Sequence, residues 1–103
     1  MLSELKAIFD VVEKLLEKRK VSQEQKIRDK VVIAIYILGD NGKKAVSSDE
    51  LEAKGGFPKK QIHQSIDLAK SEGWIISASN HKGMAWALTP NAMYYVEGLL
   101  ENK

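Results

Sequence analysis

Between residues 47 and 100 the apolar residues change their spacing twice, and this alternation constrains the fold more than any other feature of the chain. Up to Gly73 they recur every three or four residues, as in a helix, whereas residues 74–88 form short runs rich in strand formers and small apolar residues. Helical spacing returns after Thr89. This part of the chain therefore predicts two helices, a β-hairpin and a last helix, in that order.

The ends of the first two helices carry their own signals. Ser47 and Glu50 stand three residues apart, as in the capping box that starts a helix, and a Gly-Gly pair ends that short helix. Pro58 suits the first turn of a second helix, because its missing N–H would have no partner there. Gly73 is typical of a left-handed helix end. The two helices thus meet across a tight turn.

The second helix, over residues 58–72, is predicted to have one apolar and one polar face. Ile62, Ile66 and Ala69 recur at spacings of four and three, which puts them on one side at about 100° per residue. The opposite side carries side chains whose donors and acceptors need water or a polar partner. These side chains belong to Lys59, Lys60, His63, Gln64 and Asp67.

The predicted hairpin consists of the runs 74–79 and 84–88, which are separated by four residues that include Gly83. Each run contains one tryptophan. We expect Trp74 and Trp86 to anchor the hairpin to the core.

Helices flank this unit on both sides. Thr89 and Pro90 supply an N-cap and a first-turn proline for the last helix. Upstream, residues 27–38 are apolar on nearly every side, as expected for the central helix of a small core. The segment that most resembles a linker is residues 20–26.

The composition bounds the function. With 103 residues the chain is most simply one domain. Its net charge is only +2, so the overall charge does not by itself predict nucleic-acid binding. The distribution is more informative, because residues 54–83 carry five lysines against two acidic residues while the rest of the chain is slightly acidic. The chain has no cysteine, which excludes disulfides and thiolate metal sites.

The order helix, helix, helix, hairpin, helix resembles the winged-helix family of DNA-binding domains over about residues 27–100. The most family-like phrases are residues 70–75 (KSEGWI) and residues 86–91 (WALTPN). The resemblance implies a mainly α fold with a small β-hairpin wing, a winged helix-turn-helix over residues 27–103. An extra N-terminal amphipathic helix over residues 1–20 and a C-terminal helix complete the expected architecture.

This resemblance implies a sequence-specific double-stranded DNA-binding protein, such as a small transcriptional regulator. Helix 58–72 would enter the major groove, where Gln64 can bind adenine bidentately and Lys60 can donate to guanine or phosphate. At the hairpin tip, His81 and Lys82 would lie over phosphate or the minor groove, or simply in solvent. The expected DNA contacts are Lys54, Lys59, Lys60, Gln61, His63, Gln64, His81 and Lys82.

An apolar stripe runs along the N-terminal segment, where Leu, Ile, Val and Phe recur every three or four residues over residues 2–16. The sequence does not decide what buries this apolar stripe. The helix folds back onto its own domain, or it pairs with its copy in a second chain. We prefer the homodimer, which would engage DNA half-sites about one helical turn apart, ~10 base pairs. The expected interface residues are Leu5, Phe9, Val12 and Leu16.

No catalytic constellation is visible, so we expect no enzyme activity. His63 and His81 fall on different predicted elements without metal-ligand spacing, so no metal or other cofactor is predicted, and no small-molecule substrate is evident. The N-terminus lacks the features of a secretory signal, and the longest apolar run, residues 31–38, is far too short to span a bilayer. We therefore expect a cytoplasmic protein with no membrane partner.

Two other functions stay open at this point. A winged helix can also serve as a protein–protein interaction module, because a fold does not fix a function, and the weak total charge favours that interpretation. An architectural protein that coats DNA would show salt-dependent binding with little preference for sequence.

Overall fold

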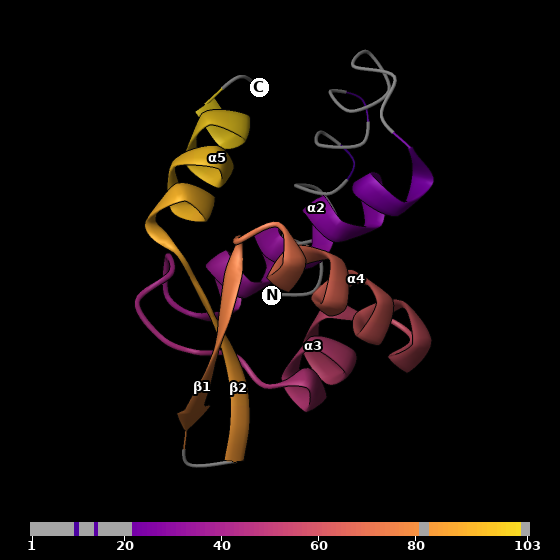
Figure 1. The fold of residues 1–103 in the computed structure, drawn as a ribbon, viewed down its shortest axis with the longest axis vertical. Helices are drawn as coiled ribbons and strands as arrows, with labels where there is room; N and C mark the ends of the chain where they lie inside the picture. The colour runs from indigo at the N-terminus through magenta and orange to yellow at the C-terminus, as the bar shows by residue number, and fades with distance from the viewer. Residues whose placement is uncertain (1–9, 11–13, 15–21, 81–82, 102–103) are drawn as a thin grey trace.

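The computed structural model describes residues 22–80 and 83–101, together with Asp10 and Lys14. Figure 1 shows the predicted order of elements, three helices followed by a hairpin and a last helix. The elements are α2 (Gln23–Leu38), α3 (Ser48–Gly55), α4 (Lys59–Ser71), β1 (Ile75–Asn80), β2 (Gly83–Leu88) and α5 (Pro90–Glu101).

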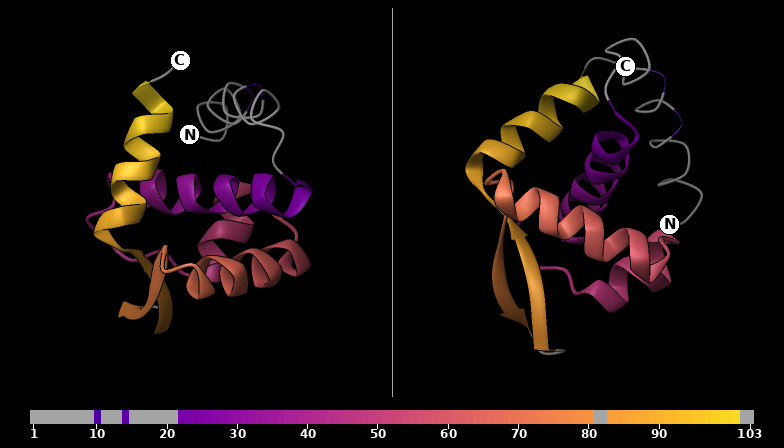
Figure 2. Two further views of the ribbon diagram at one scale, coloured as in Figure 1. Left: turned by 45° about the horizontal axis from the view of Figure 1, so that its top comes forward. Right: turned by 45° about the vertical axis from the view of Figure 1, so that its right-hand side comes forward.

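Helix α2 forms the centre of the core. Residues 31–35 are all buried, on every side of the helix, as their continuous apolar character predicts. They are covered by α3, α4, α5 and β2, each of which contacts α2. The left view of Figure 2 shows α2 lying over α4, with α5 crossing it at one end.

The start of α2 differs from the prediction. The helix begins at Gln23, because Ser22 caps it and Gln25 closes a capping box with Ser22. Residues 23–26, which looked like part of a linker, are its first turn. Their side chains are polar and exposed or half-buried, so they add nothing to the apolar spacing from which the helix was predicted.

The ends of α3 and α4 follow the predicted signals closely. Ser47 accepts from the backbone N–H of Glu50 at 3.1 Å, which completes the capping box of α3. Pro58 is the N-cap of α4, so this helix begins one residue later than predicted. At the other end Gly73 has φ +78°, and its N–H donates to the carbonyl of Lys70 while the N–H of Trp74 donates to that of Ala69. These two bonds form a Schellman helix end.

The hairpin is tighter than predicted and gains a third backbone partner. Its strands pair from Ile75↔Leu88 to Asn80↔Gly83, so two residues connect them rather than four, and those two lie outside the described residues. Val46 and Trp86 also exchange two N–H···O bonds, each 2.9 Å long, in an isolated antiparallel bridge. A single bridge has no sequence period, so the sequence did not indicate it.

Two glycine variants test this account of the helices. Gly73→Ala is expected to lower the free energy of unfolding by about 1 kcal/mol or slightly more, because Gly73 has a left-handed backbone. Gly98→Ala, inside α5, is expected to raise it by up to about 1 kcal/mol, because alanine favours helix and the added Cβ meets no atom within 4 Å. Urea denaturation of both variants measures the two effects. A change of the same sign in both would contradict the account.

Candidate nucleic-acid interface

Helix α4 turns one side into the core and the other to the surface. Ile62, Ile66 and Ala69 are buried as predicted, and Ser65 is buried beside them. Gln61 is half-buried at the boundary between the two sides. The exposed side is made of Lys59, Lys60, His63, Gln64, Asp67 and Lys70.

One flank of this exposed side faces α3 and the hairpin. The Lys59 ammonium lies 4.0 Å from a carboxylate oxygen of Glu52 in α3. The Lys70 ammonium lies 5.3 Å from the ring centroid of Trp86 in β2, within cation–π range. Both pairs link a lysine of α4 to the neighbouring element.

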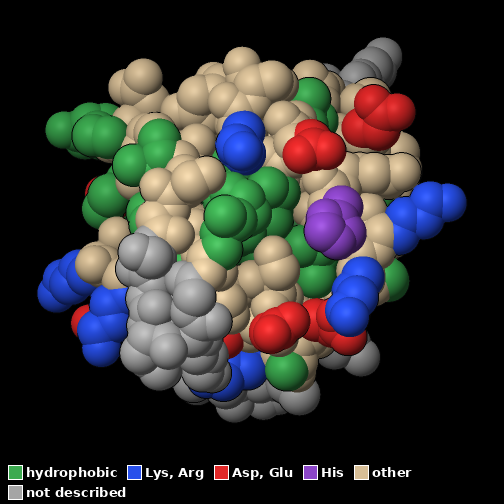
Figure 3. Space-filling view, turned by 60° about the horizontal axis from the view of Figure 1, so that its bottom comes forward, with side chains coloured by type: hydrophobic (Ala, Val, Ile, Leu, Met, Phe, Trp, Pro, Cys, Tyr) green, Lys and Arg blue, Asp and Glu red, His purple; other side chains and the backbone are tan. Residues whose placement is uncertain are grey.

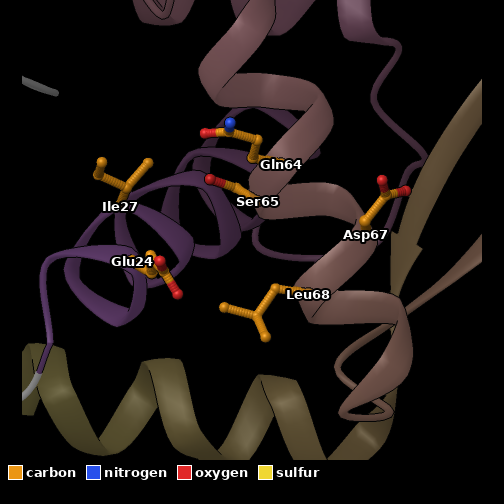
Figure 4. Close-up of a pocket in the computed structure, with 6 residues that line it drawn as sticks. All are labelled: Glu24, Ile27, Gln64, Ser65, Asp67 and Leu68. Carbon is orange, nitrogen blue, oxygen red and sulfur yellow. The ribbon is translucent and has the colours of Figure 1, made fainter.

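The other flank of α4 borders a groove of about 380 Å³ against the first turns of α2. Figure 4 shows Glu24 and Ile27 on the α2 wall, and Gln64 and Leu68 reaching into the space from α4. Gln64 therefore stands at the border between this groove and the outer surface of α4.

The hairpin is held in a fixed relation to α3 and α4. The Trp86 indole N–H donates to the Ser48 hydroxyl at 3.0 Å, at the start of α3. Together with the bridge to Val46, this bond confirms the predicted role of Trp86 as an anchor. Figure 1 places the hairpin at the same end of the molecule as α3.

The charges on this end of the molecule are mixed. Helix α3 carries Asp49, Glu50 and Glu52 before Lys54, which is exposed in its last turn. Figure 3 looks from the hairpin end and shows acidic and basic side chains interspersed among the described residues. The acidic residues of α3 thus offset part of the positive charge that the lysines of α4 supply.

Several predicted site residues lie outside the part of the chain that the structure describes. They are His81 and Lys82 at the hairpin tip and the expected interface residues Leu5, Phe9, Val12 and Leu16. Asp10 and Lys14, from the polar side of the predicted N-terminal helix, are helical and exposed.

The described residues form neither a metal site nor a membrane-spanning helix. No cluster of His, Asp or Glu among them could hold a metal ion. None of the helices that they form has both the length and the apolar character needed to cross a membrane.

The sequence did not indicate a buried ionic cluster where α2, α4 and α5 meet, formed by Arg28, Asp29, Glu72 and Tyr95 and called the Arg28 cluster below. Arg28 donates to Asp29 through Nε at 3.0 Å and contacts Glu72 through a second nitrogen. The Tyr95 hydroxyl donates to the other oxygen of Asp29 at 2.7 Å. The adjacent opposite charges of Arg28 and Asp29, just before the apolar residues 31–35, were the one signal for it.

Burial shifts the ionisation of this cluster. Loss of water raises the pKa of Asp29 above its ordinary value, although the hydrogen bond from Tyr95 and the charge of Arg28 both act to lower it. Loss of water acts to lower the pKa of Arg28, but the hydrogen bond and charge of Glu72 and the charge of Asp29 outweigh it, so that pKa is raised.

Comparisons with known proteins identify the fold. No family model and no curated protein sequence matches the chain. Among solved structures, Bordetella bronchiseptica BpsR, whose DNA binding is regulated by 6-hydroxynicotinic acid, superposes with a TM-score of 0.66 at 13% identity, over 93% of this chain and 65% of that one. The chain has the winged helix-turn-helix fold.

Two further structures agree with this assignment of the fold. A cysteine-to-serine variant of E. coli MarR, complexed with operator DNA, gives a TM-score of 0.65 at 15% identity, over 93% of this chain and 65% of that one. A MarR family protein from Bacillus stearothermophilus gives 0.62 at 14% identity, over 97% and 64%. The chain thus spans slightly less than two thirds of the length of each of these neighbours. In the winged helix-turn-helix fold described above, α3 and α4 form the helix-turn-helix and β1–β2 form the wing.

The pKa of Asp29 gives the winged helix a testable pH dependence. Because this pKa is higher in the folded protein than in the unfolded chain, the folded state binds more protons between the two values. The stability that Asp29 contributes is therefore present at low pH and falls as the pH rises. The unfolding free energy of wild type minus that of Asp29→Asn should decrease as the pH rises above about 4, the ordinary pKa of an aspartate. Urea denaturation at four pH values measures it, and a constant or rising difference would contradict the assignment.

Proposed function

We propose that this chain is a sequence-specific double-stranded DNA-binding protein, acting as a small dimeric transcriptional regulator, that inserts α4 into the major groove. The observation that carries the proposal is the exposed polar face of the first turns of α4, flanked by α3 and by an anchored wing. A helix presented in this way between two supporting elements has the geometry by which helix-turn-helix proteins approach base edges.

The residues that point furthest from the core would meet the bases in this proposal. At about 100° per residue, Lys60, Gln64 and Asp67 point away from the buried side of α4. Gln64 would bind adenine bidentately, and Lys60 would donate to guanine or to phosphate. Asp67 carries a negative charge one turn beyond Gln64, so it marks the end of the contact unless it accepts from a cytosine amino group.

The remaining residues would position the helix. Lys54 and Lys59 would contact phosphates on either side of the turn between α3 and α4, with Gln61 and His63 beside them. His81 and Lys82 would extend the contact from the wing. The operator-bound MarR variant supports duplex DNA as the partner, because it shares this fold.

The proposed dimer accounts for the apolar stripe of the N-terminal segment. Pairing through Leu5, Phe9, Val12 and Leu16 would place two α4 helices on half-sites about one helical turn apart, ~10 base pairs, on a near-palindromic operator. Light scattering at micromolar concentration tests this part separately, since a monomeric mass would contradict it.

The double variant Lys60→Ala/Gln64→Ala tests the proposed reading face. Both side chains are exposed, so the melting temperature should stay within about 2 °C of wild type. Affinity for a selected duplex should fall about tenfold or more, because a bidentate base contact and a second donor are lost. Fluorescence anisotropy of a labelled duplex measures the affinity.

Lys43→Ala is the matched control for this experiment. Lys43 is also an exposed lysine, but it belongs to the loop after α2, which lies across the molecule from α4 in Figure 1. Its removal should leave the affinity close to that of wild type. Unchanged affinity in the Lys60→Ala/Gln64→Ala variant would remove α4 from the interface.

A second function, a protein–protein interaction module, is favoured by the acidic residues of α3 that offset the lysines of α4. Glu52→Gln distinguishes the two functions. If Lys59 contacts phosphate, removing the nearby carboxylate should raise duplex affinity about two- to fivefold at low salt, with stability changed by less than about 0.5 kcal/mol. No duplex binding by wild type even at low salt would favour the interaction module.

A further inference from the structure

The Arg28 cluster lies where the C-terminal end of α4 meets α2 and α5. Arg28 and Asp29 belong to α2, Glu72 is the C-cap of α4, and Tyr95 belongs to α5. The side chains of Arg28 and Asp29 are only 7% and 1% exposed. One buried pair of residues therefore links three helices through directional hydrogen bonds.

The wing is tied to the same point. Glu72 is followed by Gly73 and then by Trp74, whose ring centroid lies 4.8 Å from that of Tyr95. The Arg28 guanidinium carbon lies 5.9 Å from the Trp74 ring centroid. Thr89, at the other end of the hairpin, donates to the carbonyl of Gly73 at 2.7 Å. Both ends of the wing are thus held next to Glu72: the first strand follows it after Trp74, and Thr89 after the second strand bonds to Gly73.

The Arg28 cluster contributes little net free energy to folding. Burying two charges in an apolar core costs several kcal/mol per ion, which their attraction offsets only in part. The indole N–H of Trp74 is also buried with no hydrogen-bond partner among the described residues. Apolar side chains of similar volume would stabilise the same position at least as well.

The hydrogen bonds of the cluster instead orient α4 relative to its neighbours. The apolar contacts of α4 have no preferred direction, whereas the charge-assisted hydrogen bond from Arg28 to the carboxylate of Glu72 is directional and ties the end of α4 to α2. Lys60 stands twelve residues before Glu72, about 18 Å along the helix. A tilt of about 10° at the C-cap would therefore move Lys60 by about 3 Å, the length of a hydrogen bond.

We propose that the Arg28 cluster is a positioning device for DNA binding, which sets the orientation of α4 and of the wing relative to α2 and α5. The inference rests on the proposed function, because it is the contact with DNA that requires this orientation. Arg28, Asp29, Glu72 and Tyr95 are positioning residues in this scheme, and none of them touches the duplex.

Tyr95→Phe is the sharpest test, because it removes the hydroxyl that donates to Asp29 and keeps the ring that packs on Trp74. Its matched control is Tyr94→Phe, which removes the hydroxyl of the neighbouring tyrosine, 76% exposed on the same helix. Arg28→Lys is a second variant, since it keeps the positive charge and loses the planar fork.

Three measurements separate positioning from a merely structural role. Tyr95→Phe and Arg28→Lys should bind the duplex about fivefold or more weakly at temperatures where both are folded, and the slope of log affinity against log salt should fall by about one as a phosphate contact is lost. Backbone amide NMR signals of residues 59–63 should also shift in free Tyr95→Phe. Tyr94→Phe should match wild type in all three.

The outcomes are distinct. Wild-type affinity and salt slope in a folded Tyr95→Phe variant, with amide shifts confined to the cluster, would overturn the inference and leave the proposed function standing. If wild type binds no duplex at all, the proposed function fails, and an undisturbed first turn of α4 in Tyr95→Phe would show that the cluster does not set its position either. If Arg28→Lys does not fold, Tyr95→Phe still decides the question.

Discussion

The burial of five consecutive residues in α2 is the constraint on which the rest of the structure depends. Residues 31–35 project in all directions around the helix, so no single neighbour can cover them. Each large apolar side chain among them contributes about 1.5–3 kcal/mol when it is removed from water. The chain meets this demand by wrapping α3, α4, β2 and α5 around one helix. The winged helix is thus a way of enclosing a helix that is apolar on every side.

The fold was largely predictable because its signals are local. Ser47, Gly73 and Thr89 act through hydrogen bonds or backbone conformations set within a few residues, and the structure places each of them at the helix end that the sequence indicates. The start of α2 was missed although Ser22 and Gln25 form an equally local capping box, because the helix was predicted from its apolar residues and its first turn places none of them in the core.

The interactions that hold the candidate site in place were not predictable in this way. The Val46 bridge joins residues forty positions apart through the backbone, and backbone groups are the same in every residue. The pairing of Arg28 with Glu72 spans 44 positions and depends on how α4 crosses α2. The sequence showed which side of α4 is polar, but it did not show that one flank faces α3 and the wing while the other borders a groove against α2.

The weak net charge of the chain and a DNA-binding role are compatible if geometry, more than bulk attraction, sets the affinity. A protein with few lysines at its interface gains little from long-range attraction, so each phosphate contact must form with good geometry. That requirement makes a fixed orientation of α4 more valuable here than it would be on a strongly basic surface, where displaced contacts can be replaced by neighbouring ones. A buried ionic cluster that adds little net stability but fixes the angle between helices suits that need.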